Sequence, residues 1–217
     1  MLENLQNEVE NMNKKILYLC KQDSKLNQIY KGCQVFYSPF IKKPKLMIIG
    51  INPGSGYYKS QGKIVQKFEP IDNYNEGGVL FEELRYMIFK EMNKQDIFLS
   101  SFITNAYYFA TEKSSDLNNF LKLLPEDLRS ELKQKSTQWL KYLISTVSPK
   151  IILCTGHQAF DIVKSFYAED MVISINKGHV LEAKIDSIPV IACKRMFSTI
   201  VKKPLLIQKL TEYLNEN

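Results

Sequence analysis

Residues 46–54 read Leu-Met-Ile-Ile-Gly-Ile-Asn-Pro-Gly and combine two strong structural signals. The first half is continuously apolar and ends at Gly50, which is typical of a parallel β-strand buried on both faces. The second half is a turn signal, because proline fixes one backbone angle and glycine accepts angles that other residues avoid. The sequence therefore predicts a buried strand and a tight turn, with the amide of Asn52 projecting from the strand end.

Helical and strand-like segments alternate around this stretch. Further strand-like runs lie at about 98–108, 150–155, 180–185 and 188–193, and helical patterns cover 2–19, 79–92, 117–147, 157–167 and 204–215. Strands that alternate with long helices indicate an α/β protein with a mainly parallel sheet. We therefore expect a three-layer α/β/α fold around a central, mainly parallel four-stranded sheet.

Length and composition favour one soluble domain. The chain has 217 residues, 45% of them apolar, which is enough for a single buried core. We expect residues 1–217 to form one domain, on which residues 1–44 dock as an N-terminal helical extension. No apolar run approaches the roughly 20 residues of a membrane span, and the polar start lacks the features of a secretory signal. A cytoplasmic monomer is expected.

The cysteines and histidines give no metal-site pattern. Cysteines stand at 20, 33, 154 and 193, without a Cys-x-x-Cys pair, and the chain has only two histidines. This spacing argues against zinc sites, iron–sulfur clusters and a disulfide framework, and it favours buried thiols. We predict no metal site and no cofactor.

Basic residues suggest where a polyanion could bind. Twenty-nine Lys and Arg against 23 Asp and Glu give a net charge of +6, which suits a polyanionic partner without demonstrating one. Residues 57–67 and 194–203 are basic and contain no acid, whereas the lysines of 14–45 are more typical of a solvated surface. The two acid-free stretches are therefore the candidate contacts.

The common nucleotide-binding loops are absent. Gly56 and Gly62-Lys63 have five residues between them and are followed by Ile64, so they miss the Walker pattern. No Gly-x-Gly-x-x-Gly segment opens a helix, which argues against a dinucleotide site.

In open α/β sheets, ligands bind at the carboxyl ends of the strands. This rule selects residues 50–54, Asn105, Gly156-His157 and 193–198. Two neutral amides, Asn52 and Asn105, stand there. Each also has a purely structural interpretation, as part of a turn or as a cap.

Several segments together resemble the uracil-DNA glycosylase superfamily. Gly50-Ile-Asn-Pro-Gly54 is similar to its first catalytic motif, in the form found in mismatch-specific uracil/thymine glycosylases. The resemblance continues in the same order through 67–70 with 76–79, 103–106, 151–159 and 177–192. Matches in order over five segments are more specific than any single motif.

The resemblance implies roles for individual residues. Asn52 would orient the attacking water, and Asn105 would read the edge of the uracil. Phe68 would stack on the base, although Tyr57 or Tyr58 could serve instead. The remaining base-binding residues would be Gly50, Ile51, Pro53 and Gly54. The DNA-binding residues would be Lys194, Arg195, Met196, Ser198, Lys59 and Lys63.

The last motif departs from the family pattern. Where most members have His-Pro-Ser or Asn-Pro-Ser, this chain reads Cys193-Lys-Arg-Met-Phe-Ser198. Either Lys194 or Arg195 could supply the positive charge that a histidine gives the departing base, and Met196 or Phe197 could wedge into the base stack.

The resemblance thus implies a monofunctional glycosylase that removes uracil or a related deaminated base from DNA, in base excision repair. Two alternatives remain. The chain could be a nucleic-acid-binding member of the fold that has lost catalysis, or an α/β protein that binds a small nucleotide or base and never meets DNA.

Overall fold

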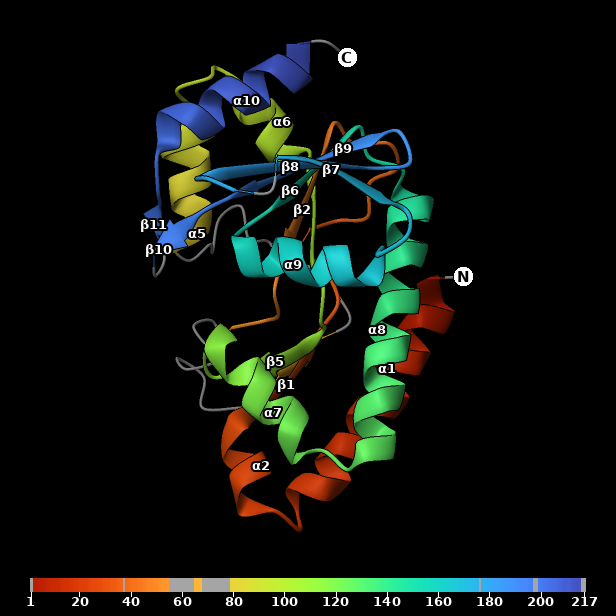
Figure 1. Ribbon diagram of the computed structural model, residues 1–217. Helices are drawn as coiled ribbons and strands as arrows, with labels where there is room; N and C mark the ends of the chain where they lie inside the picture. Colours follow the sequence, from red (N-terminus) through yellow and green to blue (C-terminus); the bar gives the residue numbers. More distant parts are fainter. Residues whose placement is uncertain are drawn as a thin grey trace.

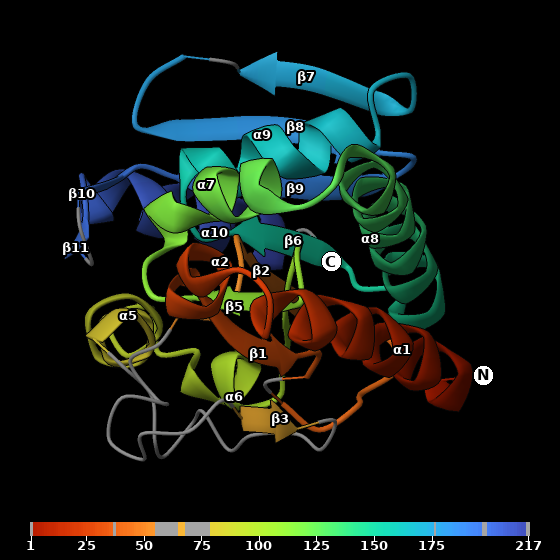
Figure 2. The ribbon, with the colours of Figure 1, turned by 90° about the horizontal axis from the view of Figure 1, so that it is seen from below.

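The protein is built on a six-stranded sheet. The computed structural model describes residues 2–36, 38–54, 65–67, 79–175, 177–196 and 199–215. The strand order in this part is β4-β2-β6-β9-β8-β7, and Figure 2 shows β9, β8 and β7 following one another to one edge. The strands are β2 (Leu46–Gly50), β4 (Phe102–Asn105), β6 (Ile151–Cys154), β7 (Met171–Ile175), β8 (Val180–Ile185) and β9 (Ile188–Cys193).

Four neighbouring strands, β4, β2, β6 and β9, run parallel, and β8 and β7 continue the sheet in antiparallel fashion. The predicted α/β/α class is confirmed, but the sheet has six strands and not four. β8 joins because Asp186 adopts a positive φ of 52° and turns the chain back, so that Ile185 pairs with Ile188. The sequence gives little sign of β7, because most of its residues are not buried.

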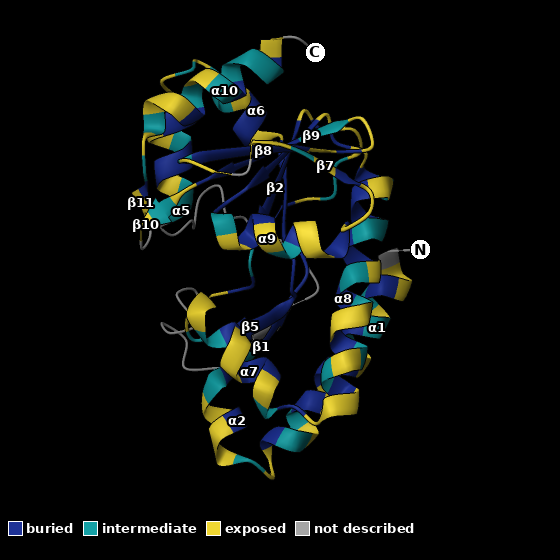
Figure 3. Cartoon of the chain, in the orientation of Figure 1, coloured by how far each residue is buried: buried dark blue, intermediate teal, exposed yellow. Residues whose placement is uncertain are grey.

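The alternation of side chains along β2 creates two cores. Met47 and Ile49 point into one cluster, and Leu46 and Ile48 point into the other. The first cluster lies under α8 (Glu126–Val147) and α9 (His157–Phe166), and the second lies under α6 (Gln95–Leu99) and α10 (Lys203–Asn215). Figure 1 shows α9 on one side of the sheet and α10 with α6 on the other, and in Figure 3 the strands between them are dark blue. This arrangement explains why β2 and β6 are apolar throughout.

A second, three-stranded sheet has the order β3-β1-β5. It contains β1 (Tyr30–Gln34), β3 (Val65–Lys67) and β5 (Phe109–Thr111). The prediction of one strand over 98–108 is therefore wrong in detail. Residues 95–99 form α6, β4 ends at Asn105, and β5 follows after a turn. A short apolar run cannot be assigned to helix or strand by periodicity alone. Here the tertiary packing determines which part is helix and which part is strand.

The N-terminal segment contains α1 (Leu2–Cys20), as predicted, and also α2 (Ser24–Ile29) and β1, so it is not purely helical. The predicted helix at 117–147 appears as α7 (Leu117–Leu123) and α8, separated at Pro125. The predicted helix at 79–92 begins as α5 (Val79–Glu82) and continues as a π-helix, η1 (Glu83–Phe89). None of the helices in the described ranges is long and apolar enough to cross a membrane.

Candidate active site

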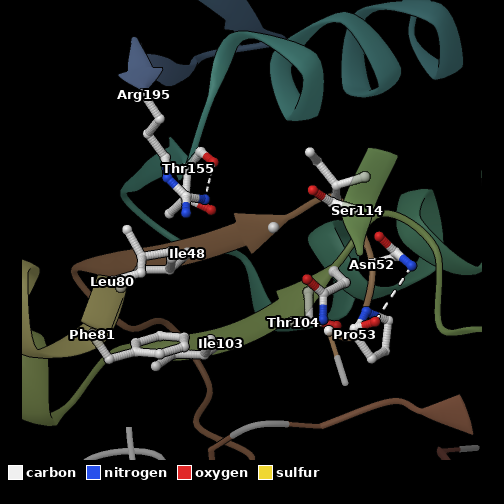
Figure 4. A pocket seen from close by; sticks show the side chains of 14 residues that line it. Ile48, Asn52, Pro53, Leu80, Phe81, Ile103, Thr104, Ser114, Thr155 and Arg195 are labelled. Carbon is white, nitrogen blue, oxygen red and sulfur yellow. Dashed lines mark hydrogen bonds between the residues drawn. The ribbon is translucent and has the colours of Figure 1, made fainter. Parts of the chain in front are cut away.

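A cavity of about 240 Å³ lies at the carboxyl ends of β2, β4 and β6 (Figure 4). Its volume is below the roughly 300–1,000 Å³ of pockets for drug-sized ligands, which suits a ligand as small as a nucleobase. It is lined by Ile48, Gly50, Ile51, Asn52, Pro53, Gly54, Leu80, Phe81, Ile103, Thr104, Asn105, Ser114, Thr155 and Arg195. Arg195 is the only charged residue among these described lining residues.

Asn52 presents a buried amide oxygen. Its Nδ2 atom donates to the hydroxyl of Thr111 at 2.8 Å, to the carbonyl of Phe109 at 3.1 Å and to that of Pro53 at 3.3 Å. Its Oδ1 atom is buried and accepts no hydrogen bond from any described residue. In Figure 4 the nitrogen is the end joined to Pro53, and the oxygen points the other way. Because the nitrogen is occupied by acceptors, the amide orientation leaves an acceptor for a ligand or water.

Asn105 depends on the absence of a side chain at Gly50. The two residues pair across β4 and β2, and both line the cavity. A Cβ atom on Gly50 would lie 2.2 Å from Oδ1 of Asn105, so only glycine leaves room for this amide. The glycine at the strand end therefore places the Asn105 amide in the cavity.

Arg195 brings positive charge to the cavity from a short hairpin, β10 (Arg195–Met196) and β11 (Thr199–Ile200). Its Nη1 atom donates to the carbonyl of Thr155 at 3.2 Å, and its buried Nε atom has no partner among the described residues. Burial lowers the pKa of this guanidinium, while Cys193 and Glu83 oppose the shift. An arginine stays charged in proteins, so the side chain remains a cation.

The Arg195 hairpin is anchored by Glu83 of η1. One carboxylate oxygen of Glu83 accepts the backbone N–H of Ile200 at 2.9 Å, and the other pairs with Lys203 at 2.7 Å. Ile200 is the cross-strand partner of Arg195. Lys203 offsets part of the negative charge of Glu83, which also acts on Arg195. Figure 1 shows β10 and β11 beside α5, which leads into η1.

A comparison with known protein families matches residues 38–207 to the uracil DNA glycosylase superfamily. The chain belongs to this superfamily. A comparison with curated proteins gave no match. Membership indicates a DNA-glycosylase type of function.

Seven residues expected from the superfamily resemblance meet in the one cavity: Gly50, Ile51, Asn52, Pro53, Gly54, Asn105 and Arg195. Lys194 and Met196 are exposed and do not line it. Phe68, Ser198, Lys59 and Lys63 lie outside the described residues, as do Tyr57, Tyr58 and Phe197.

Other lining residues were missed by sequence reasoning. Thr155 directly follows β6, so the strand-end rule could have found it. Phe81 comes from α5 and Ser114 from a short 3₁₀ helix, η2 (Ser114–Asp116), and neither position carries a local signal. The described residues contain no group of three His, Cys, Asp or Glu side chains that could hold a metal ion.

Proposed function

We propose that this member of the superfamily hydrolyses the N-glycosidic bond of uracil, or of a related deaminated base, flipped out of DNA. One observation carries the proposal. A nucleobase-sized cavity is lined both by Asn52, whose buried acceptor has no partner among the described residues, and by Arg195, whose buried Nε donor has none. Buried polar atoms are normally hydrogen-bonded, so such a pair indicates a site that a ligand completes.

The cavity suits a base more than a nucleotide. Extruding a base costs a few kcal/mol, and least for a mismatched one, and the enzyme must recover this cost inside the pocket. Asn105 offers one donor group and one acceptor, so its amide can pair with the N3–H and O4 edge of uracil. Phe81 and Ile103 supply apolar surface, and Phe68 remains a proposed stacking residue.

Asn52 is proposed to hold the attacking water. Its Oδ1 atom can accept a hydrogen bond from that water and direct the oxygen lone pair to the sugar carbon. An amide is a weak base, so it contributes by position more than by proton abstraction. Bond cleavage through an oxocarbenium-like state tolerates a weak nucleophile when the leaving base is stabilised. A slow enzyme is expected.

Arg195 is proposed to stabilise the departing base. Negative charge develops on the base as the bond breaks, and a fixed cation in a small cavity stabilises it more strongly than a solvated one. Of the two candidates from the sequence, Arg195 lines the cavity, whereas Lys194 is exposed. Lys194, Met196, Ser198, Lys59 and Lys63 remain proposed DNA contacts.

The test is excision from uracil-containing single- and double-stranded oligonucleotides, followed by alkali cleavage and gel electrophoresis. We expect an abasic product with the wild type and at least about 100-fold slower formation of it with Asn52→Ala. Asn118→Ala, which changes an exposed asparagine of α7, is the matched control and should retain full activity. Absence of product with every deaminated base tested would overturn the proposal.

A second candidate, DNA binding without catalysis, is favoured by one observation. The last motif lacks both the histidine and the proline of the common family pattern. In that case Asn52→Ala leaves DNA affinity unchanged and there is no turnover to lose. Affinity that does not fall with added salt would instead indicate a small base or nucleotide as ligand.

A further inference from the structure

Asn52 is held largely by residues of the three-stranded sheet β3-β1-β5. The central strand of this sheet, β1, precedes the part of the chain that matches the family. The match begins at residue 38, whereas β1 ends at Gln34. Two of the three acceptors of the Asn52 nitrogen, the Phe109 carbonyl and the Thr111 hydroxyl, belong to β5. In the described sheet β5 has β1 as its neighbour. Figure 2 shows β1 lying against β5, with α1 beside them.

Every residue of β5 pairs with β1. Phe109 pairs with Cys33, Ala110 with Gly32 and Thr111 with Tyr30. The N–H of Gln34 also donates to the carbonyl of Tyr108 at 2.8 Å. A three-residue strand is not stable alone, so β5 depends on its neighbours. β1 supplies its ladder, and the turn after β2 adds a hydrogen bond from the Thr111 N–H to the Pro53 carbonyl at 3.3 Å. The same strand, β1, pairs with β3 on its other side.

The pairing is fixed in turn by the helices of the N-terminal segment. Tyr30 is fully buried, stacks on Phe120 at a ring-centroid distance of 5.4 Å, and donates its hydroxyl to Asn13 of α1. Glu8 of α1 accepts hydrogen bonds from Lys135 at 2.9 Å and Trp139 at 3.0 Å in α8. The hydrogen bond from Lys135 contributes most to holding the pKa of Glu8 below its usual value. The segment is thus joined to the body of the fold at both ends.

We propose that residues 2–36 position Asn52 for hydrolysis, through the pairing of β1 with β5. The segment acts as a positioning element and touches no substrate. Its effect on hydrolysis rests on the proposed function, but its effect on the Asn52 amide can be measured without turnover. An experiment can therefore contradict the positioning proposal without contradicting the proposed function, and the reverse.

Gly32→Ala tests the pairing. Gly32 has a φ of 105° at a register shift in the β1–β5 ladder, and alanine is strained at such angles. Gly178→Ala is the matched control, because Gly178 has a φ of 117° in the turn before β8. An added Cβ there would have no heavy atom nearer than 4.0 Å. Both changes cost similar backbone strain, but only the first lies in the positioning element.

The first readout is proton exchange of the Asn52 side-chain amide in a ¹⁵N-labelled protein. Its signals are assigned by their loss in Asn52→Ala. We expect Gly32→Ala to speed this exchange about tenfold, because the acceptors on β5 move, and Gly178→Ala to leave it unchanged. Equal exchange in wild type and Gly32→Ala would overturn the proposal.

The second readout is the single-turnover rate of uracil excision. We expect Gly32→Ala to lower it about tenfold with DNA affinity preserved, and to cause no further loss in an Asn52→Ala background. An equal fold-loss in both backgrounds would overturn positioning through Asn52. If the wild type cleaves no substrate, the proposed function fails, and amide exchange alone decides this proposal.

A milder variant covers the case in which Gly32→Ala does not fold. Tyr30→Phe keeps the ring that stacks on Phe120 and removes the hydroxyl that donates to Asn13. We expect amide exchange at Asn52 to become about threefold faster, since the strand loses one anchor and keeps its packing. Unchanged exchange in this folded variant would count against the proposal.

Discussion

The two sides of the cavity are held in different ways. On the Asn52 side, the amide nitrogen has three acceptors, and Phe109 and Thr111, which supply two of them, are fully buried. On the Arg195 side, the guanidinium has one hydrogen bond to the described residues, of 3.2 Å to Thr155, and its strand β10 spans two residues. Lys194 and Met196, which flank it, are exposed.

The two sides therefore differ in how firmly their polar groups are held. The Asn52 side, which is proposed to hold the water, lies in the buried core, whereas Arg195 belongs to a short hairpin anchored by Glu83. Removing the Asn52 amide should therefore lower activity more than removing the Arg195 charge.

The largest effect is expected for Asn52→Ala. It removes the acceptor proposed to hold water, and we expect the single-turnover excision rate to fall at least about 100-fold, within the range for loss of a group that assists proton transfer or positions a nucleophile. DNA affinity, measured by fluorescence anisotropy, should change less than about twofold, since the proposed phosphate contacts do not include Asn52. A variant that keeps more than a tenth of the rate would contradict a rigid water-holding side.

Arg195→Met should have a smaller effect, about 10- to 100-fold on the same rate, because it removes one stabilising cation and leaves the water site intact. Arg195→Lys should recover part of the loss. Lys194→Met is the neighbouring control and should weaken DNA binding at low salt while the excision rate at saturation stays constant. If Lys194→Met lowers the rate as much as Arg195→Met, the assignment of the charge to Arg195 is wrong.

Glu83→Gln tests the anchor of the hairpin. We expect the excision rate to fall about three- to tenfold as Arg195 loses its position. Glu182→Gln is a matched control, because Glu182 is also buried, pairs with Lys209 at 3.1 Å and accepts from Tyr213 at 2.9 Å. Both changes should destabilise the protein, by about 1–3 kcal/mol. Equal rates for the two variants would show that Glu83 only stabilises the fold.

The smallest expected effect concerns the reactivity of two buried cysteines, Cys33 on the Asn52 side and Cys193 on the Arg195 side. Burial raises the pKa of Cys33 in β1 to about 12, and that of Cys193 at the end of β9 to about 11, where the charge of Arg195 partly opposes the rise. Both thiols are fully buried and should therefore resist alkylation near pH 8. Modification of either thiol in the folded protein at that pH would contradict this expectation.

The same shifts make stability depend on pH. A folded thiol keeps its proton at pH values where the unfolded thiol, with a pKa of about 8.5, has lost it, so the folded state binds more protons there. The stabilisation by these thiols is complete at pH values below the pKa of the unfolded thiol. It is lost as the pH rises through the pKa values of the folded thiols. We expect the melting temperature to fall between about pH 8 and pH 10.5, with a shallower slope in Cys33→Ala than in wild type. Identical slopes would contradict this assignment.

The sequence predicted the residues of the Asn52 side better than the elements that hold the site in place. Gly50, Asn52 and Asn105 could be found because they end apolar strands, and the ends of parallel strands meet at one edge. The choice between Lys194 and Arg195 could not be made, because it depends on how the short β10–β11 hairpin is anchored by Glu83, which is distant in sequence. The pairing of β1 with β5 could not be predicted either, since both strands are short and distant in sequence.

That distance has a consequence for biosynthesis. Asn52 and Thr111 are 59 residues apart in the chain, and Arg195 follows much later. Contacts between distant residues cost more loop-closure entropy than local contacts do. On the ribosome, Asn52 therefore emerges well before Thr111, which holds its amide nitrogen, and before Arg195.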